Sequence, residues 1–223
     1  SNSSSNQKRK KLAKLNRIKK EHILASIALF MIFSPTLSYS KSSSALYLTK
    51  DMKYLYTANL DGGSVSKVDA NSGEKIFEKS LGKDIRRIAF NQDESIYAVT
   101  DFLDNKVIFL DSSNNKIIKT IKTKNRPHAI LYDEKNRYFF VTIYEDNEIL
   151  VIEDKKFEII KTIKTELTPR GMAITSDGRL LVTHAMIGVV SIYDSRSLVR
   201  LKTITLHSTS NEDEFVSQGK PRL

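Results

Sequence analysis

The chain of 223 residues contains no cysteine and no tryptophan, and only eight glycines and four prolines. Without cysteine it can form no disulfide, no thiolate metal site and no cysteine nucleophile. The low glycine and proline counts exclude collagen-like and low-complexity chains. What is present is a globular balance, with 40% hydrophobic and 28% charged residues. A chain of this length buries a sizeable core, and packing and hydrogen bonds alone must hold it together.

The net charge of +10 is concentrated in the first 21 residues. They carry eight basic side chains and one acidic side chain, so the remaining residues carry a net charge of only +3. Binding to nucleic acid without sequence preference depends on a basic surface that releases counterions from the phosphates. Because the rest of the chain lacks that excess of charge, we expect no nucleic-acid partner.

The basic segment leads into an apolar run of eleven residues, Ile23 to Phe33, and then into Ser34-Pro35. Small residues follow at Ser38 and Ser40, the spacing of a signal cleavage site. As a helix the apolar run spans about 16 Å, roughly half the hydrocarbon thickness of a bilayer. We therefore expect residues 1–40 to be a secretory signal peptide, and the mature chain to be periplasmic or extracellular with no stable membrane span. An uncleaved membrane anchor and a basic amphipathic helix are the alternatives.

Most of the chain consists of four copies of a unit of about 42 residues. The segment IIKTIKT at residues 117–123 returns unchanged at residues 159–165. An apolar or aromatic residue followed by an acid recurs at spacings of 42, 42 and 41, as Val68-Asp69, Leu110-Asp111, Ile152-Glu153 and Tyr193-Asp194. The copies cover about residues 44–84, 85–126, 127–168 and 169–207.

Each copy has the pattern of four short strands. In the third copy, runs rich in Ile, Val, Phe, Tyr and Thr at residues 128–132, 137–143, 148–153 and 158–165 are separated by polar turns. The last run alternates Ile with Lys or Thr, which predicts one buried face and one solvated face protected by lysines. About forty residues that form one four-stranded antiparallel sheet are a blade of a β-propeller, an all-β fold.

The second predicted strands share one tetrapeptide profile. Its four copies are YTAN at 56–59, AVTD at 98–101, FVTI at 140–143 and LVTH at 181–184. The chain thus resembles the YVTN-type bacterial β-propeller repeat proteins, which are relatives in fold of lactonase-like propellers. The resemblance implies six to eight blades, usually seven. It indicates fold more strongly than function, because the family includes surface proteins, periplasmic binding scaffolds and propellers fused to redox enzymes.

Four blades are fewer than this family implies. Pro127 and Pro169 each open a blade, and residues 219–223, with Pro221-Arg222, resemble the start of a fifth blade after a polar insert at 208–218. We therefore expect the N-terminal part of a larger ring, whose open blade edges would allow a homo-oligomer. A closed four-bladed ring and an eight-bladed ring made by two chains are the alternatives.

The sequence contains no catalytic constellation. It has no phosphate-binding glycine loop, no H-E-x-x-H and no G-x-S-x-G, and its histidines lack metal-ligand spacing. Asp104-Asn105 and Asp146-Asn147 recur at one turn of the repeat. A calcium site is one interpretation of this pair, and ordinary turn chemistry is the other.

Basic residues recur where the first strand of each blade begins. Arg86, His128 and Arg170 lie 42 residues apart, and Arg222 follows Pro221 in the same relation. The first strand of a propeller blade lines the central channel, so these side chains would ring one mouth of it. The final position of the tetrapeptide profile, which includes Asp101 and His184, is expected at the same face.

Converging basic groups would hold a carboxylate, a phosphate or the propionates of a haem. The candidate ligand-binding residues are Arg86, His128, Arg170, His184, Arg222 and Asp101. The alternative is that each arginine pairs with an aspartate of a neighbouring blade and only closes the ring.

Two functions fit these observations. The first is an exported, non-catalytic binding or scaffold propeller with a protein partner or a small anionic ligand. The second is the propeller part of an enzyme, either a lactonase-like hydrolase or a haem-containing oxidoreductase. In a haem-d1-type propeller, His128 or His184 would be the axial ligand. The residues specify no cofactor by themselves.

Overall fold

A computed structural model describes residues 43–206. All regular secondary structure in the described part is β-strand, and the strands form four separate antiparallel sheets. The first sheet contains β1 (Ser43–Leu48), β2 (Tyr54–Asn59), β3 (Ser64–Asp69) and β4 (Lys75–Ser80). The second contains β5 (Ile85–Phe90), β6 (Ile96–Asp101), β7 (Lys106–Asp111) and β8 (Ile117–Lys122). The third contains β9 (Pro127–Asp133), β10 (Tyr138–Ile143), β11 (Glu148–Glu153) and β12 (Ile159–Lys164), and the fourth contains β13 (Pro169–Ile174), β14 (Arg179–His184), β15 (Val189–Asp194) and β16 (Arg200–Thr205).

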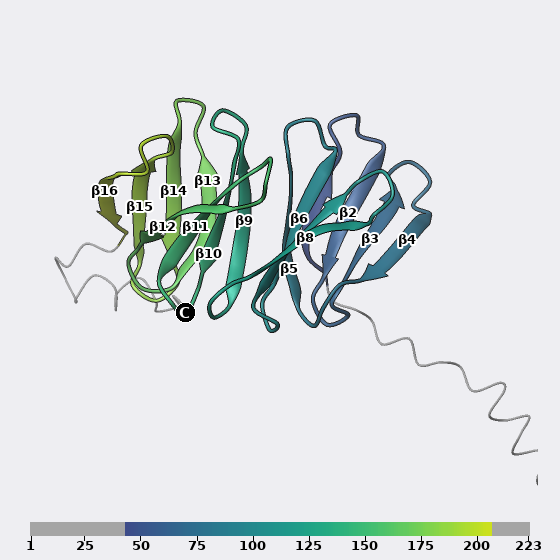
Figure 1. Ribbon diagram of the computed structural model, residues 1–223, viewed down its shortest axis with the longest axis horizontal. Helices are drawn as coiled ribbons and strands as arrows, with labels where there is room; N and C mark the ends of the chain where they lie inside the picture. The colour runs from purple at the N-terminus through teal and green to yellow at the C-terminus, as the bar shows by residue number, and fades with distance from the viewer. Residues whose placement is uncertain (1–42, 207–223) are drawn as a thin grey trace, which may run out of the picture. The chain divides into compact units, whose positions relative to one another are not determined.

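In each sheet the strands follow chain order, so every sheet is a simple meander (Figure 1). The first strands pack against one another in a row, β1 against β5, β5 against β9 and β9 against β13. This arrangement of four-stranded meanders around their first strands is that of β-propeller blades, as the repeat predicted. Among the described residues, no close packing joins β13 back to β1.

Aromatic and branched side chains fill the space between neighbouring sheets. Phe109 of β7 contacts two rings of the third blade, with centroid distances of 5.2 Å to Phe139 in β10 and 4.6 Å to Phe157 in the turn before β12. Tyr56 and Tyr97 join the first two sheets in the same way, at 5.5 Å. Such pairs contribute about 0.5–1.5 kcal/mol each beyond the burial of their area. Each sheet therefore depends on its neighbour for its core.

The recurring acid at the end of the third strand makes a turn. Oδ1 of Asp69 accepts the N–H groups of Asn71 and Ser72 at 2.9 and 2.8 Å, and Asp111 and Asp194 make the corresponding bonds. The hydroxyl of Ser113 also donates to Asp111. Together these hydrogen bonds hold the pKa of each carboxyl below its ordinary value. The acid of the repeat thus shapes the hairpin between the third and fourth strands.

The recurring Asp-Asn pair also belongs to a turn. Asn105 and Asn147 have φ angles of 54° and 55°, and Gly63 and Gly188 occupy the same place in the first and fourth blades. The Oδ1 atoms of the two asparagines accept main-chain N–H groups just before the next blade. Asn105 accepts from Arg126 at 2.8 Å, and Asn147 accepts from Thr168 at 2.7 Å. The described residues contain no cluster of three or more metal-binding side chains. The structure thus gives these asparagines a definite role in turns.

The threonine of the tetrapeptide profile links adjacent blades. Oγ1 of Thr100 donates to the main-chain carbonyl of His128 at 2.9 Å, and Oγ1 of Thr142 donates to that of Arg170 at 3.4 Å. The Thr142 hydroxyl also accepts the N–H of Ala129 at 2.9 Å. Both threonines are fully buried, so water does not compete for these bonds. The repeated threonine holds the first strand of the next blade in position.

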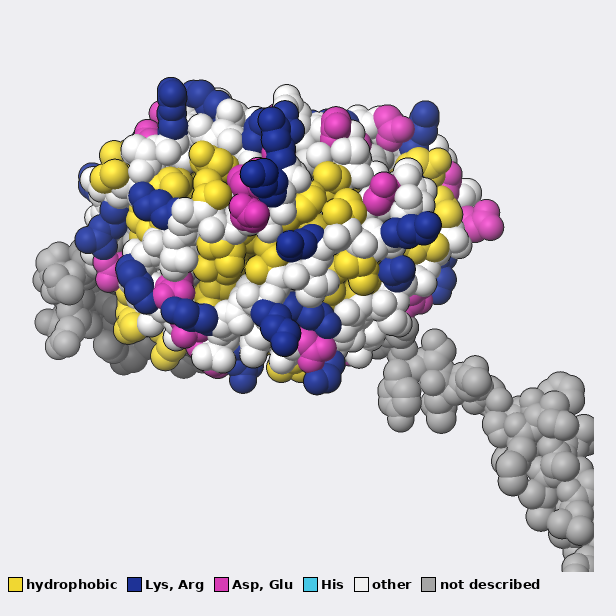
Figure 2. Space-filling view, viewed as in Figure 1, with side chains coloured by type: hydrophobic (Ala, Val, Ile, Leu, Met, Phe, Trp, Pro, Cys, Tyr) yellow, Lys and Arg dark blue, Asp and Glu magenta, His cyan; other side chains and the backbone are white. Residues whose placement is uncertain are grey.

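The outermost strands differ from the alternating burial that their sequence predicts. In β8 and β12, both leading isoleucines are exposed, with Ile117 at 51% and Ile159 at 43%, and only the last isoleucine, Ile121 or Ile163, is shielded. Sheets that radiate from a common axis move apart towards their outer edges, so a fourth strand has little to pack against. Figure 2 shows apolar side chains open to solvent among Lys and Arg on one face of the described part.

Within residues 43–206 the structure contains no helix of the length and hydrophobicity that a membrane span requires. The predicted signal peptide (residues 1–40), the polar insert (208–218) and the predicted start of a fifth blade (219–223) lie outside the described residues.

Candidate functional site

A β-bulge recurs at the start of the first strand in all four blades. The pairing register skips between Ser43 and Ala45, Ile85 and Arg87, Pro127 and Ile130, and Pro169 and Met172. The skipped positions of the last three blades include Arg86, His128 and Arg170, the residues predicted to line the channel. A bulge turns a side chain away from the regular pleat and is frequent beside functional sites. The repeat therefore gives these three residues a common, irregular backbone position.

His128 is the most buried member of this set, at 4% exposure. Its ring packs edge-on to Phe102 and also contacts Tyr144, both at 6.0 Å between centroids. Nδ1 is buried and has no hydrogen-bond partner among the described residues. Burial lowers the pKa of His128 to about 4, with repulsion from Arg87, Arg86 and Arg170 adding to the shift. The imidazole is therefore neutral at pH 7 and sits in a positive electrostatic field.

Arg86 is held by Asp84, which lies in the link between the first and second blades. Its Nε lies 3.1 Å from both carboxylate oxygens of Asp84, and its terminal nitrogen lies 2.9 Å from Oδ2. The guanidinium also stacks on Phe102, with Cζ 3.4 Å from the ring centroid. The acid that pairs with Arg86 thus lies two positions before it in the chain, between the two blades. One arginine charge of the site is balanced by this aspartate.

Arg87 joins the same group, although the repeat did not predict it. It is partly buried, and its guanidinium donates to the main-chain carbonyl of Arg86 at 2.8 Å. Burial lowers its pKa, and the charges of Arg170 and Arg86 add to the effect. The corresponding residues of the next two blades are Ala129 and Gly171, so no periodic signal marked this position. The only sequence signal was the Arg86-Arg87 doublet.

Arg170 completes the group from the fourth blade. Its side chain is exposed, and no described acidic side chain forms an ion pair with it. Its charge acts on both Arg87 and His128. We call Arg86, Arg87, His128 and Arg170 the basic cluster. Arg170 forms no ion pair with an acidic side chain of the described residues, so its positive charge lets the cluster attract anions.

The two candidates at the end of the second strand lie in a different environment. Asp101 is fully buried and accepts the main-chain N–H groups of Lys83 and Asp84, each at 3.2 Å. His184 is 4% exposed; its Nδ1 lies 3.1 Å from the carbonyl oxygen of Leu167, and its Nε2 lies 3.0 Å from Oγ of Ser191. The structure gives both residues roles in fastening the link between blades. It does not bring them into the basic cluster, and Arg222 lies outside the described residues.

Comparisons with known proteins agree with the fold. A family model described as "Cytochrome D1 heme domain" matches residues 92–222. The methylamine dehydrogenase heavy chain of Methylophilus methylotrophus is 30% identical over 100 residues, which are 44% of this chain and 24% of that protein. The chain therefore spans about a quarter of the length of this relative.

Solved structures show the same arrangement of strands. The hydrazine synthase of Kuenenia stuttgartiensis superimposes with a TM-score of 0.71 and 22% identity, covering 79% of this chain and 53% of that one. The dihydro-heme d1 dehydrogenase NirN superimposes with a TM-score of 0.63 and 18% identity, covering 73% of this chain and 36% of that one. At these identities the likeness establishes the propeller fold alone.

Proposed function

Because the chain belongs to the cytochrome D1 heme domain family, we propose that it is a binding propeller whose basic cluster holds a ligand that carries carboxylates. The observation that carries the proposal is the convergence of three arginines around the buried, neutral His128. Guanidinium groups bind carboxylates through two parallel hydrogen bonds. Arg170 is exposed and has no acidic partner among the described residues, so it is the residue best placed to do this.

The family implies a haem, and the described residues fit that group in part. The basic cluster suits the acidic substituents of a haem, which Arg170 and Arg87 would hold. An axial bond to iron is less well provided for. Both ring nitrogens of His184 are already bonded, and the unpartnered Nδ1 of His128 is buried among aromatic rings. A bound haem would supply one-electron chemistry, but the proposal rests on recognition of carboxylates.

A second candidate is the propeller part of an oxidoreductase. Two of the similar proteins favour it, because a methylamine dehydrogenase heavy chain and a dihydro-heme d1 dehydrogenase are dehydrogenases by name. The basic cluster would then position a substrate or cofactor through the same arginines. Binding of a carboxylate at Arg170 is common to both candidates, so one experiment tests their shared premise.

Replacing Arg170 by Ala is expected to weaken binding of citrate, used as a tricarboxylate probe, by about 1.5–3 kcal/mol, or roughly 10- to 150-fold. The loss follows from removal of one charge-assisted hydrogen-bonding group. Isothermal titration calorimetry measures it. The melting temperature should stay nearly unchanged, because no described side chain depends on this guanidinium.

Arg179→Ala is the matched control, since Arg179 is an exposed arginine of the same blade that pairs with Asp177. It should leave citrate binding intact. A large fall in melting temperature for Arg170→Ala, without any change in citrate affinity, would assign Arg170 a structural role and remove the basis of the proposal.

We further propose that the chain is exported, with residues 1–40 acting as a cleaved signal. The support is the order of the basic segment, the apolar run and Ser38-x-Ser40. Mass spectrometry of the protein expressed from its own gene in its own host should find a mature N-terminus at Lys41. Recovery of residues 1–40 intact from a cytosolic fraction would contradict export.

A further inference from the structure

A cavity of about 160 Å³ lies between the first two blades, away from the basic cluster. The first blade lines it from the turn between β1 and β2, from β2 and from β3, and the second blade lines it from the end of β5 onward. Its volume is roughly ten times what one water molecule needs. The lining residues that the argument uses are Asp51, Tyr54, Lys67, Phe90 and Glu94.

The cavity exists where the repeat is broken. Lys67 is the fourth residue of β3, and the fourth residues of β7, β11 and β15 are Phe109, Val151 and Ile192. These three are apolar and at most 9% exposed, and Phe109 fills the space against the rings of the third blade. The first blade therefore has an ammonium group where its sister blades have core.

The Lys67 ammonium has aromatic neighbours and, among the described residues, no ion-pair partner. Its Nζ lies 3.7 Å from the centroid of Tyr54 and 5.4 Å from that of Tyr56. No acceptor among the described residues forms a hydrogen bond or an ion pair with it. Burial lowers the pKa of Lys67, and the Asp51 carboxylate opposes this shift. A cation over aromatic rings is stabilised, but its hydrogen-bonding capacity remains for a ligand.

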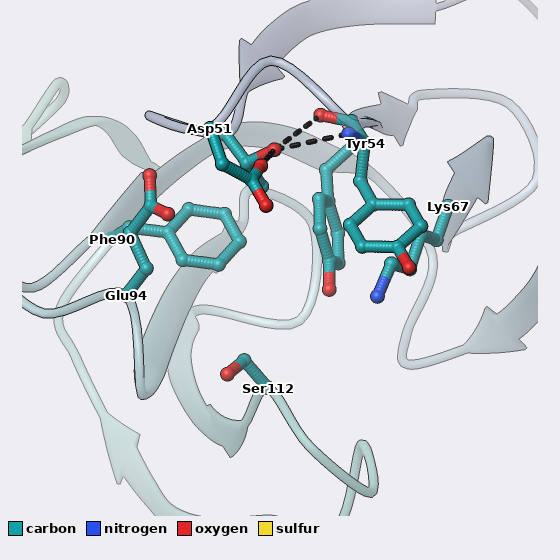
Figure 3. A pocket seen from close by; sticks show the side chains of 8 residues that line it. Asp51, Tyr54, Lys67, Phe90, Glu94 and Ser112 are labelled. Carbon is teal, nitrogen blue, oxygen red and sulfur yellow. Dashed lines mark hydrogen bonds between the residues drawn. The ribbon is translucent and has the colours of Figure 1, made fainter. Parts of the chain in front are cut away.

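Negative charge lies on the other side of the same cavity. Figure 3 shows Glu94 and Lys67 at opposite sides of the view, with the rings of Phe90 and Tyr54 between them. Oε1 of Glu94 accepts from the Tyr47 hydroxyl at 2.7 Å and from the Lys50 N–H at 2.8 Å, and both bonds leave Oε2 to other donors. The Thr49 hydroxyl and the Lys53 N–H lower the pKa of Asp51, which keeps that carboxyl charged.

We propose that this cavity is a binding site for a small zwitterion of the α-amino acid class. Its carboxylate pairs with Lys67, its ammonium pairs with Glu94 and Asp51, and its apolar side chain packs on Phe90 and the tyrosine rings. A simple carboxylate would meet two acidic side chains, and a simple amine would meet Lys67. Only a molecule that carries both charges can pair with Lys67 on one side of the cavity and with the acidic side chains on the other.

Calorimetry with the full chain and three matched probes tests this. L-Valine carries both charges, isovalerate lacks the ammonium and isobutylamine lacks the carboxylate. Valine should bind about 10- to 100-fold more tightly than either of the others, the range for losing one charge-assisted pair. Lys67→Met should weaken valine by a similar factor, whereas Lys119→Met, on the exposed strand β8, should not.

Lys67→Phe copies the second blade and fills the cavity. It should abolish valine binding and raise the melting temperature, which separates loss of the site from loss of the fold. Arg170→Ala should leave valine binding unchanged, so this site and the basic cluster fail or succeed independently. Equal affinity for valine and isovalerate would overturn the zwitterion site, as would valine binding that survives both Lys67 variants.

Discussion

Asp101→Ala is expected to lower the free energy of unfolding by about 3–5 kcal/mol, the range for removing one partner of a buried charged network. Asp101 is fully buried. Its Oδ1 accepts the N–H groups of Asp84 and Asp104, each at 3.2 Å, and its Oδ2 accepts the N–H of Lys83 at 3.2 Å and lies 3.4 Å from Nζ of Lys106. Without the carboxylate, three main-chain donors lose their acceptor. Urea unfolding followed by circular dichroism measures the change.

Asp104→Ala is the control for this experiment. Its side chain is 25% exposed and pairs with Lys83 and Lys106 in contact with solvent, so its loss should change the free energy of unfolding much less. If Asp101→Ala lowered the free energy of unfolding no more than Asp104→Ala, Asp101 would have no structural role. The ligand-binding role that the sequence suggested for Asp101 would then be the better interpretation.

Gly63→Asn is expected to destabilise the fold by about 3 kcal/mol or more, although Asn stands at the equivalent position in the second and third blades. An added Cβ at Gly63 would lie 1.9 Å from the carbonyl oxygen of Gly82 and 2.4 Å from its carbon. These are main-chain atoms, so a side-chain rotation cannot relieve the clash. Substitution towards the consensus of the repeat would here be damaging, and thermal and urea unfolding both report it.

Gly73→Asn isolates the contribution of backbone conformation. Gly73 also has a positive φ, 74°, but no atom lies within 4 Å of its added Cβ. This control should cost about 1 kcal/mol. If Gly63→Asn and Gly73→Asn lowered the free energy of unfolding equally, the contact between Gly63 and the main chain of Gly82 would not be the reason that glycine is needed at residue 63.

The all-β propeller architecture could be predicted from the sequence because the repeated residues make short-range hydrogen bonds that recur from blade to blade. The acid of the third strand, the threonine of the second strand and the residue at positive φ each make the same bonds in successive blades. A residue that performs one task in every blade leaves a periodic signal. The four meanders could therefore be predicted from spacing alone.

The candidate sites could be predicted only in part: Arg86, His128 and Arg170 follow the period, whereas two other site residues break it. Arg87 stands where later blades have Ala129 and Gly171, and Lys67 stands where they have apolar core. Periodicity also placed Asp101 and His184 at the channel mouth. Their side chains bond the main chain of the link between blades, a direction that spacing does not encode.

The identical strands β8 and β12 have a consequence for folding. Both read IIKTIK and pair with the third strand of their own blade. Because the two sequences are identical, the side chains of β8 and β12 do not determine which of them pairs with β7 and which with β11. The short hairpin that connects each strand to the third strand of its own blade determines the pairing. In dilute solution the pairing within one chain is favoured, because the hairpin keeps each fourth strand next to its correct partner. At high concentration an identical strand from another molecule competes for the same edge, and exchange of fourth strands becomes the expected route of misassembly.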